Sequence, residues 1–109
     1  MPITPVSPDY SASPQIRRED VAEIAAMGFR SIMCNRPDGE AADQPQAAEI
    51  RAEAERQGLA FAHVPVVSGA ITADDVVDFE AALAALPGPV FAYCRSGTRS
   101  QYLWMLAKR

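Results

Sequence analysis

The residues best suited to chemistry lie together in the stretch VFAYCRSGTRS, residues 90–100. A thiol, Cys94, ends an apolar run, and Gly97 and Arg99 follow it. If the chain turns from a strand into a helix here, Gly97 permits a tight turn, and the backbone N–H groups of residues 95–100 face inward. The start of the helix adds a positive dipole end, and Arg99 adds a planar fork of donors. The pattern therefore predicts a cradle for negative charge around Cys94.

Such a cradle indicates nucleophilic chemistry rather than a buried filler. Helix N-termini and nearby cations stabilise a cysteine thiolate, so we expect Cys94 to be ionised at neutral pH. The same donors would hold a tetrahedral oxyanion, and thiolate attack would give a covalent cysteine intermediate. We expect Arg99 to bind the anion and Arg95 to lie at the rim, where it attracts or contacts substrate. The Ser100 hydroxyl is expected either to hydrogen-bond Cys94 or to cap the helix. The rest of the predicted anion-binding loop is Ser96, Gly97 and Thr98.

Composition excludes several other classes of protein. The formal net charge is −4 over 109 residues, whereas a nucleic-acid surface needs a clustered basic face, so no nucleic-acid partner is expected. No apolar stretch approaches the roughly 18 residues of a membrane span, and the proline-rich start lacks the features of a secretory signal. We therefore expect a cytoplasmic protein that binds no membrane. The chain has two cysteines, far apart, and a single histidine, so we expect no disulfide framework, no metal site and no cofactor.

Strand and helix patterns alternate along the chain. Strands are expected at 29–35, 59–66 and 90–94, and helices at 18–28, 44–58, 73–86 and 99–109. Residues 10–16 are expected to form an opening strand or an extended arm. Short apolar strands separated by helices predict an α/β fold with a mostly parallel sheet. Ligands bind beyond the carboxyl ends of such strands, which is where Cys94 lies. We expect His63 to be a packed core residue, and Tyr102 and Trp104 to pack on the sheet.

Two residues near the end of the second predicted strand, 29–35, have open roles. Arg36 follows that strand at the same edge of the sheet as Cys94, so it could line the pocket or form a surface ion pair with Asp38 or Glu40. Cys34 is expected to be structural. The alternative is a resolving thiol that forms a disulfide with Cys94 on oxidation.

The loop CRSGTRS resembles the active-site loop of rhodanese-type sulfurtransferases. That loop runs cysteine, often arginine, a small residue, glycine, any residue, arginine, then serine or threonine. Four residues separate Cys94 from Arg99. Protein-tyrosine and dual-specificity phosphatases use a related loop with five intervening residues, usually preceded by histidine. This chain has Tyr93 at that position and a loop one residue shorter, and these two differences weigh against a phosphatase.

Nearly the whole chain resembles the DUF442, or beta-lactamase-hydrolase-like, family. The matching segments are YSASPQI, GFRSIMCNRPDGE, HVPVVSGAIT and LPGPVFAYCRSGTRS. The resemblance implies a dual-specificity-phosphatase-like fold: one domain over residues 1–109, with a mostly parallel sheet of four to five strands between two helix layers. Relatives occur fused to persulfide dioxygenases and to sulfide-oxidising flavoproteins. The resemblance therefore implies handling of sulfane sulfur, with such an enzyme as a partner.

Dual-specificity phosphatases usually carry an aspartate after the strand that matches HVPV, where it protonates the leaving oxygen. This chain has Val67, Ser68 and Gly69 there. Asp74 and Asp75 lie further on, at the expected start of a helix. Sulfur transfer expels a good leaving group and needs no such acid.

The leading hypothesis is therefore a cofactor-free sulfurtransferase. Cys94 would attack the outer sulfur of thiosulfate or a small persulfide, and a thiol acceptor would remove the sulfur from the resulting persulfide. The alternative is a cysteine-dependent phosphatase with a Cys94 phosphocysteine intermediate and Asp74 or Asp75 as the acid. A third class is an anion-binding or redox-sensing module without turnover.

Overall fold

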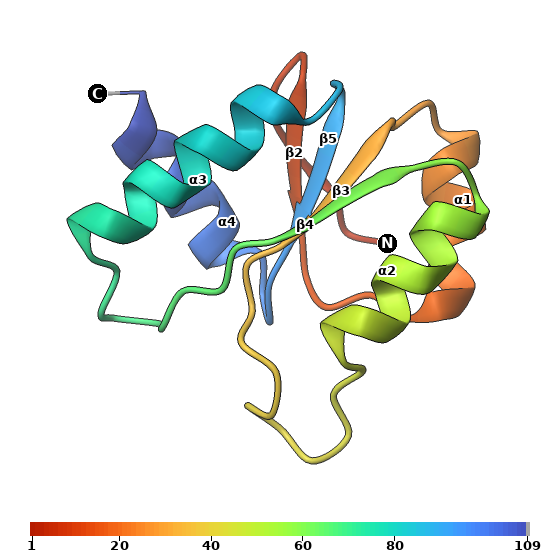
Figure 1. Cartoon of the computed structure of the whole chain (residues 1–109), viewed down its shortest axis with the longest axis horizontal. Coiled ribbons are helices and arrows are strands. Elements are labelled where there is room, and N and C mark those ends of the chain that lie inside the picture. The colour runs from red at the N-terminus through yellow and green to blue at the C-terminus, as the bar shows by residue number, and fades with distance from the viewer. Residues whose placement is uncertain (109) are drawn as a thin grey trace.

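The protein is built on a five-stranded sheet between two layers of helices (Figure 1). The computed structural model describes residues 1–108. Its strands are β1 (Thr4–Ser7), β2 (Tyr10–Ser13), β3 (Ser31–Cys34), β4 (Ala60–His63) and β5 (Val90–Tyr93). The strand order is β1-β2-β5-β3-β4, and every neighbouring pair is parallel except β1 with β2. The predicted α/β sandwich with a mostly parallel sheet is confirmed.

Two helices cover each face of the sheet. The helices are α1 (Val21–Ala26), α2 (Ala47–Arg56), α3 (Ala73–Ala85) and α4 (Thr98–Ala107), with a 3-10 turn before α1. Alternation along β5 sends Phe91 and Tyr93 to the α1 and α2 side, and Val90 and Ala92 to the α3 and α4 side. Both faces of the central strands are therefore buried, which explains why they lack the polar alternation of an exposed sheet.

The first strand was not predicted from the sequence. Residues 1–9 are rich in proline, which cannot donate to a sheet ladder. Pro5 nevertheless pairs with Ser11, because β1 is an edge strand and the register shifts between Pro5 and Ser7. An edge strand at a register shift is where proline is tolerated.

The predicted helices and strands are present with shorter limits. The helix expected at 44–58 begins only at Ala47, because the backbone of the N-cap residue Gln46 is extended, with φ of −71° and ψ of 148°. The last helix runs from Thr98 to Ala107, and residue 109 of the predicted range lies outside the described residues. Within residues 1–108, every helix is too short or too polar to span a bilayer.

The strand order brings three loops to one edge of the sheet. The segments that follow β3, β4 and β5 all emerge at the lower side of the sheet in Figure 1. Because β5 pairs with β2 and β3, Cys94 is flanked by the ends of both neighbours. Residues far apart in sequence therefore meet around the loop that follows Cys94.

Removal of a central core side chain should destabilise the fold without touching this edge. Phe91 on β5 is fully buried and meets Phe29 edge to face at 5.3 Å. Phe91→Ala should lower the free energy of unfolding by about 3–5 kcal/mol, because it leaves a cavity in the core. Val77→Ala is the matched control on an exposed position of α3, with an expected change within about 0.5 kcal/mol. Urea unfolding measures both, and equal losses would contradict this account of the core.

Candidate active site

Cys94 lies at the start of a tight turn that leads from β5 into α4. The Gly97 N–H donates to the Cys94 Sγ at 3.1 Å, and Gly97 is the N-cap of α4 with φ of 92°. A Cβ at Gly97 would also lie 3.3 Å from the Ser13 carbonyl carbon of β2. Glycine is therefore required both by the left-handed backbone and by the close approach. The predicted strand–turn–helix geometry around the thiol is present.

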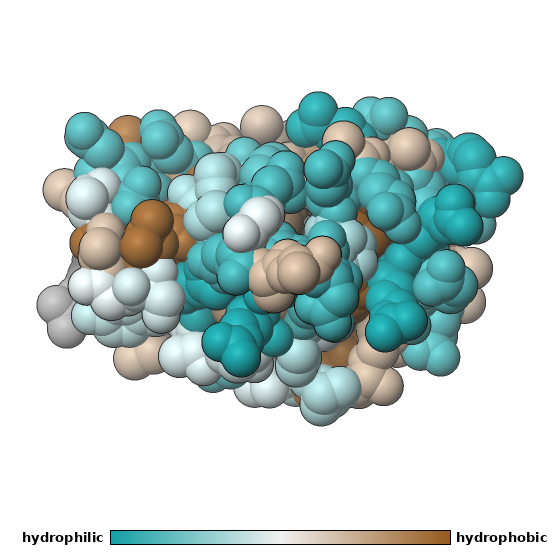
Figure 2. All heavy atoms as spheres, turned by 90° about the horizontal axis from the view of Figure 1, so that it is seen from below, coloured by the Kyte–Doolittle hydropathy of each residue, from teal (hydrophilic) through white to brown (hydrophobic). Residues whose placement is uncertain are grey.

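A pocket of about 1000 Å³ opens over this turn. Its lining residues are Arg36, Glu40, Ala41, Ser68, Gly69, Ile71, Arg95, Ser96, Thr98, Arg99 and Tyr102. Cys94 itself is fully buried beneath the loop and does not line the pocket. Figure 2 faces the edge of the sheet that carries this loop, and the surface there is mainly hydrophilic. Three arginines against one glutamate make the pocket cationic in a chain with a net charge of −4.

Arg99 stands in the first turn of α4 with its guanidinium held from two sides. Its Nη1 donates to Glu40 Oε2 at 2.7 Å and to the Val66 carbonyl at 3.0 Å, and its Nη2 donates to Glu40 Oε1 at 2.9 Å. A guanidinium has five N–H donors, so the Nε–H and the second Nη2–H remain on one edge. The pKa of Arg99 is raised mainly by its hydrogen bonds to Glu40, and the nearby Cys94 adds a smaller effect. Arg99 therefore retains a two-donor edge beside the thiol.

Glu40 joins two arginines. Besides the pair with Arg99, it accepts from Arg36 Nε at 2.9 Å through Oε1. Hydrogen bonds from Arg99, and then from Arg36, lower the pKa of Glu40 to about 2. Sequence analysis offered Glu40 only as a surface partner of Arg36, and the spacing of four residues was the available signal. The bridge to Arg99 was missed because it joins residues 59 positions apart.

Arg36 combines the two roles left open by the sequence. It lines the pocket and pairs with Glu40, yet only 5 % of it is exposed. Its Nη1 also donates to Gln15 Oε1 at 3.0 Å. Its carbonyl oxygen lies 2.9 Å from His63 Nε2. The expectation that His63 is a packed core residue is wrong, because His63 is half-buried and its ring contacts the loop that carries Arg36.

The Ser100 hydroxyl does not cap the helix, and its hydrogen bond to the departing Cys94 thiolate stays a prediction. Ser100 Oγ donates to Asn35 Oδ1 at 2.8 Å, and Gly97 rather than Ser100 caps the helix. Asn35 Nδ2 in turn donates to the Val64 carbonyl at 3.0 Å. This buried chain ties α4 to the ends of β3 and β4, so Ser100 fixes the position of the loop. Sequence analysis gave Asn35 no role, because a single asparagine after a strand is also an ordinary turn residue.

The other predicted residues divide between pocket and surface. Arg95, Ser96 and Thr98 are exposed and line the pocket. The expectation that Tyr102 packs on the sheet is wrong, because its side chain lies at the pocket and the residue is 48 % exposed. Trp104 does pack as expected, stacked on Tyr10 at 4.9 Å.

Neither aspartate considered as an acid reaches the pocket. Asp75 accepts from the Thr72 N–H at 2.9 Å in a capping box at the start of α3. Asp74 is exposed and is not among the pocket residues.

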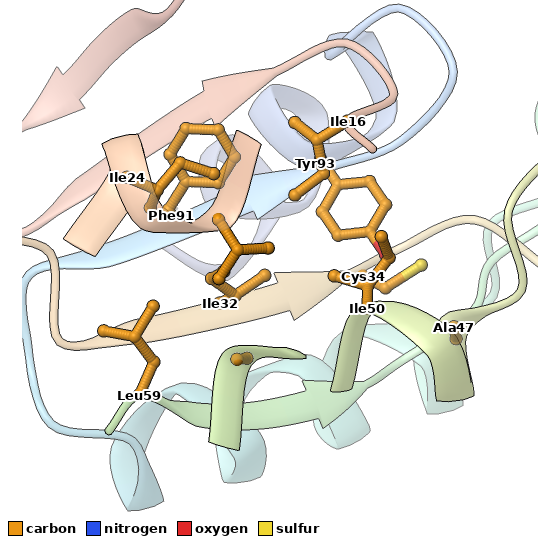
Figure 3. Close-up of a cluster of buried hydrophobic side chains, with 11 residues drawn as sticks. Ile16, Ile24, Ile32, Cys34, Ala47, Ile50, Leu59, Phe91 and Tyr93 are labelled. Atoms are coloured by element: carbon orange, nitrogen blue, oxygen red, sulfur yellow. The ribbon is translucent and has the colours of Figure 1, made fainter. Parts of the chain in front are cut away.

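Cys34 and Cys94 belong to different faces of the sheet. Cys34 pairs in register with Tyr93 and lies with it in the core cluster under α1 and α2 (Figure 3). Cys94 comes one residue after Tyr93, where alternation directs the side chain to the opposite face. Burial raises the pKa of Cys34, and its Sγ donates to the Arg36 carbonyl at 3.3 Å. This arrangement favours the structural role for Cys34 over the resolving thiol. In the described part of the chain, no three His, Cys, Asp or Glu side chains gather as metal ligands.

The Glu40 bridge predicts a specific loss of stability in acid. The pKa of Glu40 is about 2 in the folded protein against an ordinary value of 4.5, so its contribution to stability is complete above about pH 4.5 and is lost as the pH falls toward 2. The difference in free energy of unfolding between wild type and Glu40→Gln should therefore be constant above pH 4.5 and shrink below it. Urea unfolding across this range measures it. A difference that stays constant down to pH 2 would contradict the bridge.

Similar proteins show the family to which this chain belongs. A beta-lactamase hydrolase-like protein of Xylella fastidiosa is 37 % identical over 108 residues, which cover 99 % of this chain and 25 % of that protein. The chain thus spans about a quarter of the length of that relative. A Neisseria meningitidis protein, described provisionally as a phosphatase, is 38 % identical, with a TM-score of 0.91 over 99 % of this chain and 77 % of that one.

A more distant structure supports the fold alone. A DUF442 protein of Shewanella putrefaciens, also described provisionally as a phosphatase, is 17 % identical, with a TM-score of 0.85 over 97 % of this chain and 69 % of that one.

Residues 3–109 match the family described as "Beta-lactamase hydrolase-like protein, phosphatase-like domain". The chain therefore belongs to the phosphatase-like domain family of the beta-lactamase hydrolase-like proteins.

Proposed function

We propose that this domain is a cysteine-dependent phosphatase that works through a Cys94 phosphocysteine. The observation that supports it most directly is that the Gly97 N–H, at the start of α4, donates to the Cys94 Sγ at 3.1 Å, with Arg99 in the first turn of the same helix. A helix N-terminus with an arginine edge suits a phosphoryl group, because both stabilise negative charge on its oxygens. Membership of a phosphatase-like family and likeness to a structure described provisionally as a phosphatase add to this support.

The first step transfers the phosphoryl group to sulfur. The Cys94 thiolate attacks phosphorus, an S–P bond forms, and the P–O bond to the leaving group breaks, with its electron pair departing on oxygen. The free Nε and Nη2 edge of Arg99 and the N–H groups of residues 95–99 bind the non-bridging oxygens. These donors are already fixed by Glu40 and by the turn, so they need little reorganisation as charge shifts in the transition state.

The second step returns the enzyme to its starting state. Water attacks phosphorus, a P–O bond forms, and the S–P bond breaks with its electron pair returning to Cys94. The water proton passes to the phosphate product or to solvent. The sulfur departs with negative charge, and the Gly97 N–H that donates to the Cys94 Sγ at 3.1 Å stabilises that charge.

Sulfur transfer, the leading hypothesis from the sequence, receives no support from the comparisons, which favour the phosphatase alternative. A loop with four intervening residues, one fewer than in the tyrosine phosphatases, weighs little against a phosphatase, because Arg99 already lies in the first turn of α4, two residues after Gly97. The sulfur-oxidising partner and the cytoplasmic location stay predictions. The activity of any longer protein that contains this domain would be set by its other parts as well.

Substitution of the nucleophile provides the first test. Cys94→Ser should lower the hydrolysis of p-nitrophenyl phosphate to background, because an alcohol at this site is a far weaker nucleophile than a thiolate. Cys34→Ser is the matched control and should keep most of the activity, since Cys34 lies under the other face of the sheet. Phosphate release by the purified variants measures both. Equal activity of Cys94→Ser and wild type would exclude the proposed intermediate.

Arg99 and its anchor provide the second test. Arg99→Lys should reduce kcat/KM by about 100-fold or more, because an ammonium cannot offer the two-donor edge. Glu40→Gln should cause a smaller loss of roughly 10-fold, since an amide holds the guanidinium less firmly than a carboxylate does. Steady-state kinetics on folded variants measure these losses. An unchanged kcat/KM in Arg99→Lys would refute a bidentate role for Arg99.

A further inference from the structure

We propose, building on the phosphatase proposed above, that the substrates are phosphoanhydrides: compounds in which the leaving group is itself a phosphate. Two features of the pocket point to this class. The described lining offers no carboxylic acid free to protonate a leaving oxygen, and it holds two arginines beyond the one beside Cys94.

The first feature is the state of the one carboxylate in the described lining. Both oxygens of Glu40 accept hydrogen bonds from guanidinium groups at 2.7–2.9 Å. A pKa of about 2 keeps Glu40 ionised at neutral pH, so it has no proton to give. The loop after β4, where a phosphatase acid would be expected, presents Ser68 and Gly69 to the pocket.

The chemical consequence concerns the bond that breaks. A general acid typically contributes a factor of about 10² to 10⁴ when the leaving oxygen is basic. Without it, an alkoxide would have to depart unprotonated, which is slow. A phosphate leaves as a stable anion and needs no proton. When the Cys94 thiolate attacks the terminal phosphorus of an anhydride, the bridging P–O bond breaks and its electron pair stays on the departing phosphate.

The second feature is the distribution of positive charge. Arg99 holds the phosphoryl group that is transferred, so Arg95 is left to pair directly with the leaving group and Arg36 adds positive charge to the pocket wall. Arg95 is exposed at the rim, and Arg36 lies in the wall with its Nε and Nη1 donors engaged by Glu40 and Gln15. A departing phosphate would be paired by such cations, whereas a neutral alcohol or phenol would gain nothing from them.

Tyr102 is the competing proton donor, because its hydroxyl belongs to a residue that lines the pocket. A tyrosine can act as a general acid. Tyr102→Phe separates the two accounts. If Tyr102 protonates the leaving oxygen, the loss of turnover should be at least about 100-fold larger for glycerol phosphate than for tripolyphosphate, and that result would overturn the proposal. Equal effects on the two substrates support it.

The substrate test compares four probes on the wild-type protein: tripolyphosphate, inorganic pyrophosphate, p-nitrophenyl phosphate and glycerol phosphate. We expect kcat/KM for tripolyphosphate to exceed that for glycerol phosphate by at least about 100-fold. Arg95→Ala should lower kcat/KM for tripolyphosphate more than for p-nitrophenyl phosphate, because only the former has an anionic leaving group of several charges.

Addition of an acid to the loop after β4 provides an independent test. Ser68→Asp would place a carboxyl group in the pocket lining and should raise kcat/KM for glycerol phosphate by about 10-fold or more. Val67→Asp is the matched control, because Val67 is exposed and adjacent but does not line the pocket. It should leave glycerol phosphate turnover unchanged, and thermal unfolding confirms that both variants are folded.

The outcomes separate this inference from the function on which it rests. Preferred turnover of tripolyphosphate, with the stronger Arg95→Ala effect on it, supports both. Turnover of p-nitrophenyl phosphate without turnover of either anhydride overturns the substrate class and leaves the phosphatase intact. A wild-type kcat/KM for glycerol phosphate equal to that for tripolyphosphate also overturns the substrate class and leaves the phosphatase intact. If the protein hydrolyses none of the four probes, the proposed phosphatase activity itself is overturned.

Discussion

The left-handed turn at Gly97 is the constraint on which this site depends. It places the start of α4 directly over the thiol, so that a backbone N–H reaches Cys94 Sγ at 3.1 Å. Glycine is needed there twice, once for a φ of 92° and once because the Ser13 backbone approaches so closely. The first turn of α4 also carries Arg99, and the charge of Cys94 contributes to the raised pKa of Arg99. A substitution at Gly97 would disturb nucleophile, dipole and guanidinium together.

The second organising feature is the distribution of charge over buried groups. Arg36 and Arg99 are 5 % and 8 % exposed, and burial of unpaired guanidinium groups would be costly. Glu40 offsets this by accepting from both, yet it uses one end of the Arg99 fork and leaves the other free. One carboxylate shared between two cations leaves the pocket positive. The same sharing keeps Glu40 ionised, so the feature that binds the anion also removes a proton donor.

The sequence was sufficient for the fold class and for the loop around Cys94, because both are local patterns. Alternating apolar strands and helices predicted the parallel sheet, and CRSGTRS predicted the turn and its arginine. Long-range partnerships were not predictable in this way. The Glu40–Arg99 bridge and the Ser100–Asn35 hydrogen bond join residues distant in sequence, and neither has a spacing signal. β1 was missed because proline, here Pro5, is unfavourable in every strand except one at an edge, and edge position is a property of the whole sheet.

The central claim is that the sulfur of Cys94 becomes covalently bonded to phosphorus. Rapid acid quench of the protein during turnover of p-nitrophenyl phosphate, followed by mass spectrometry of its peptides, tests this most directly. The account predicts the added mass of one phosphoryl group on the peptide that contains Cys94, and its disappearance when substrate is exhausted. Phosphate release with an unmodified Cys94 peptide at every time point, or with the phosphoryl group on another residue, would contradict it.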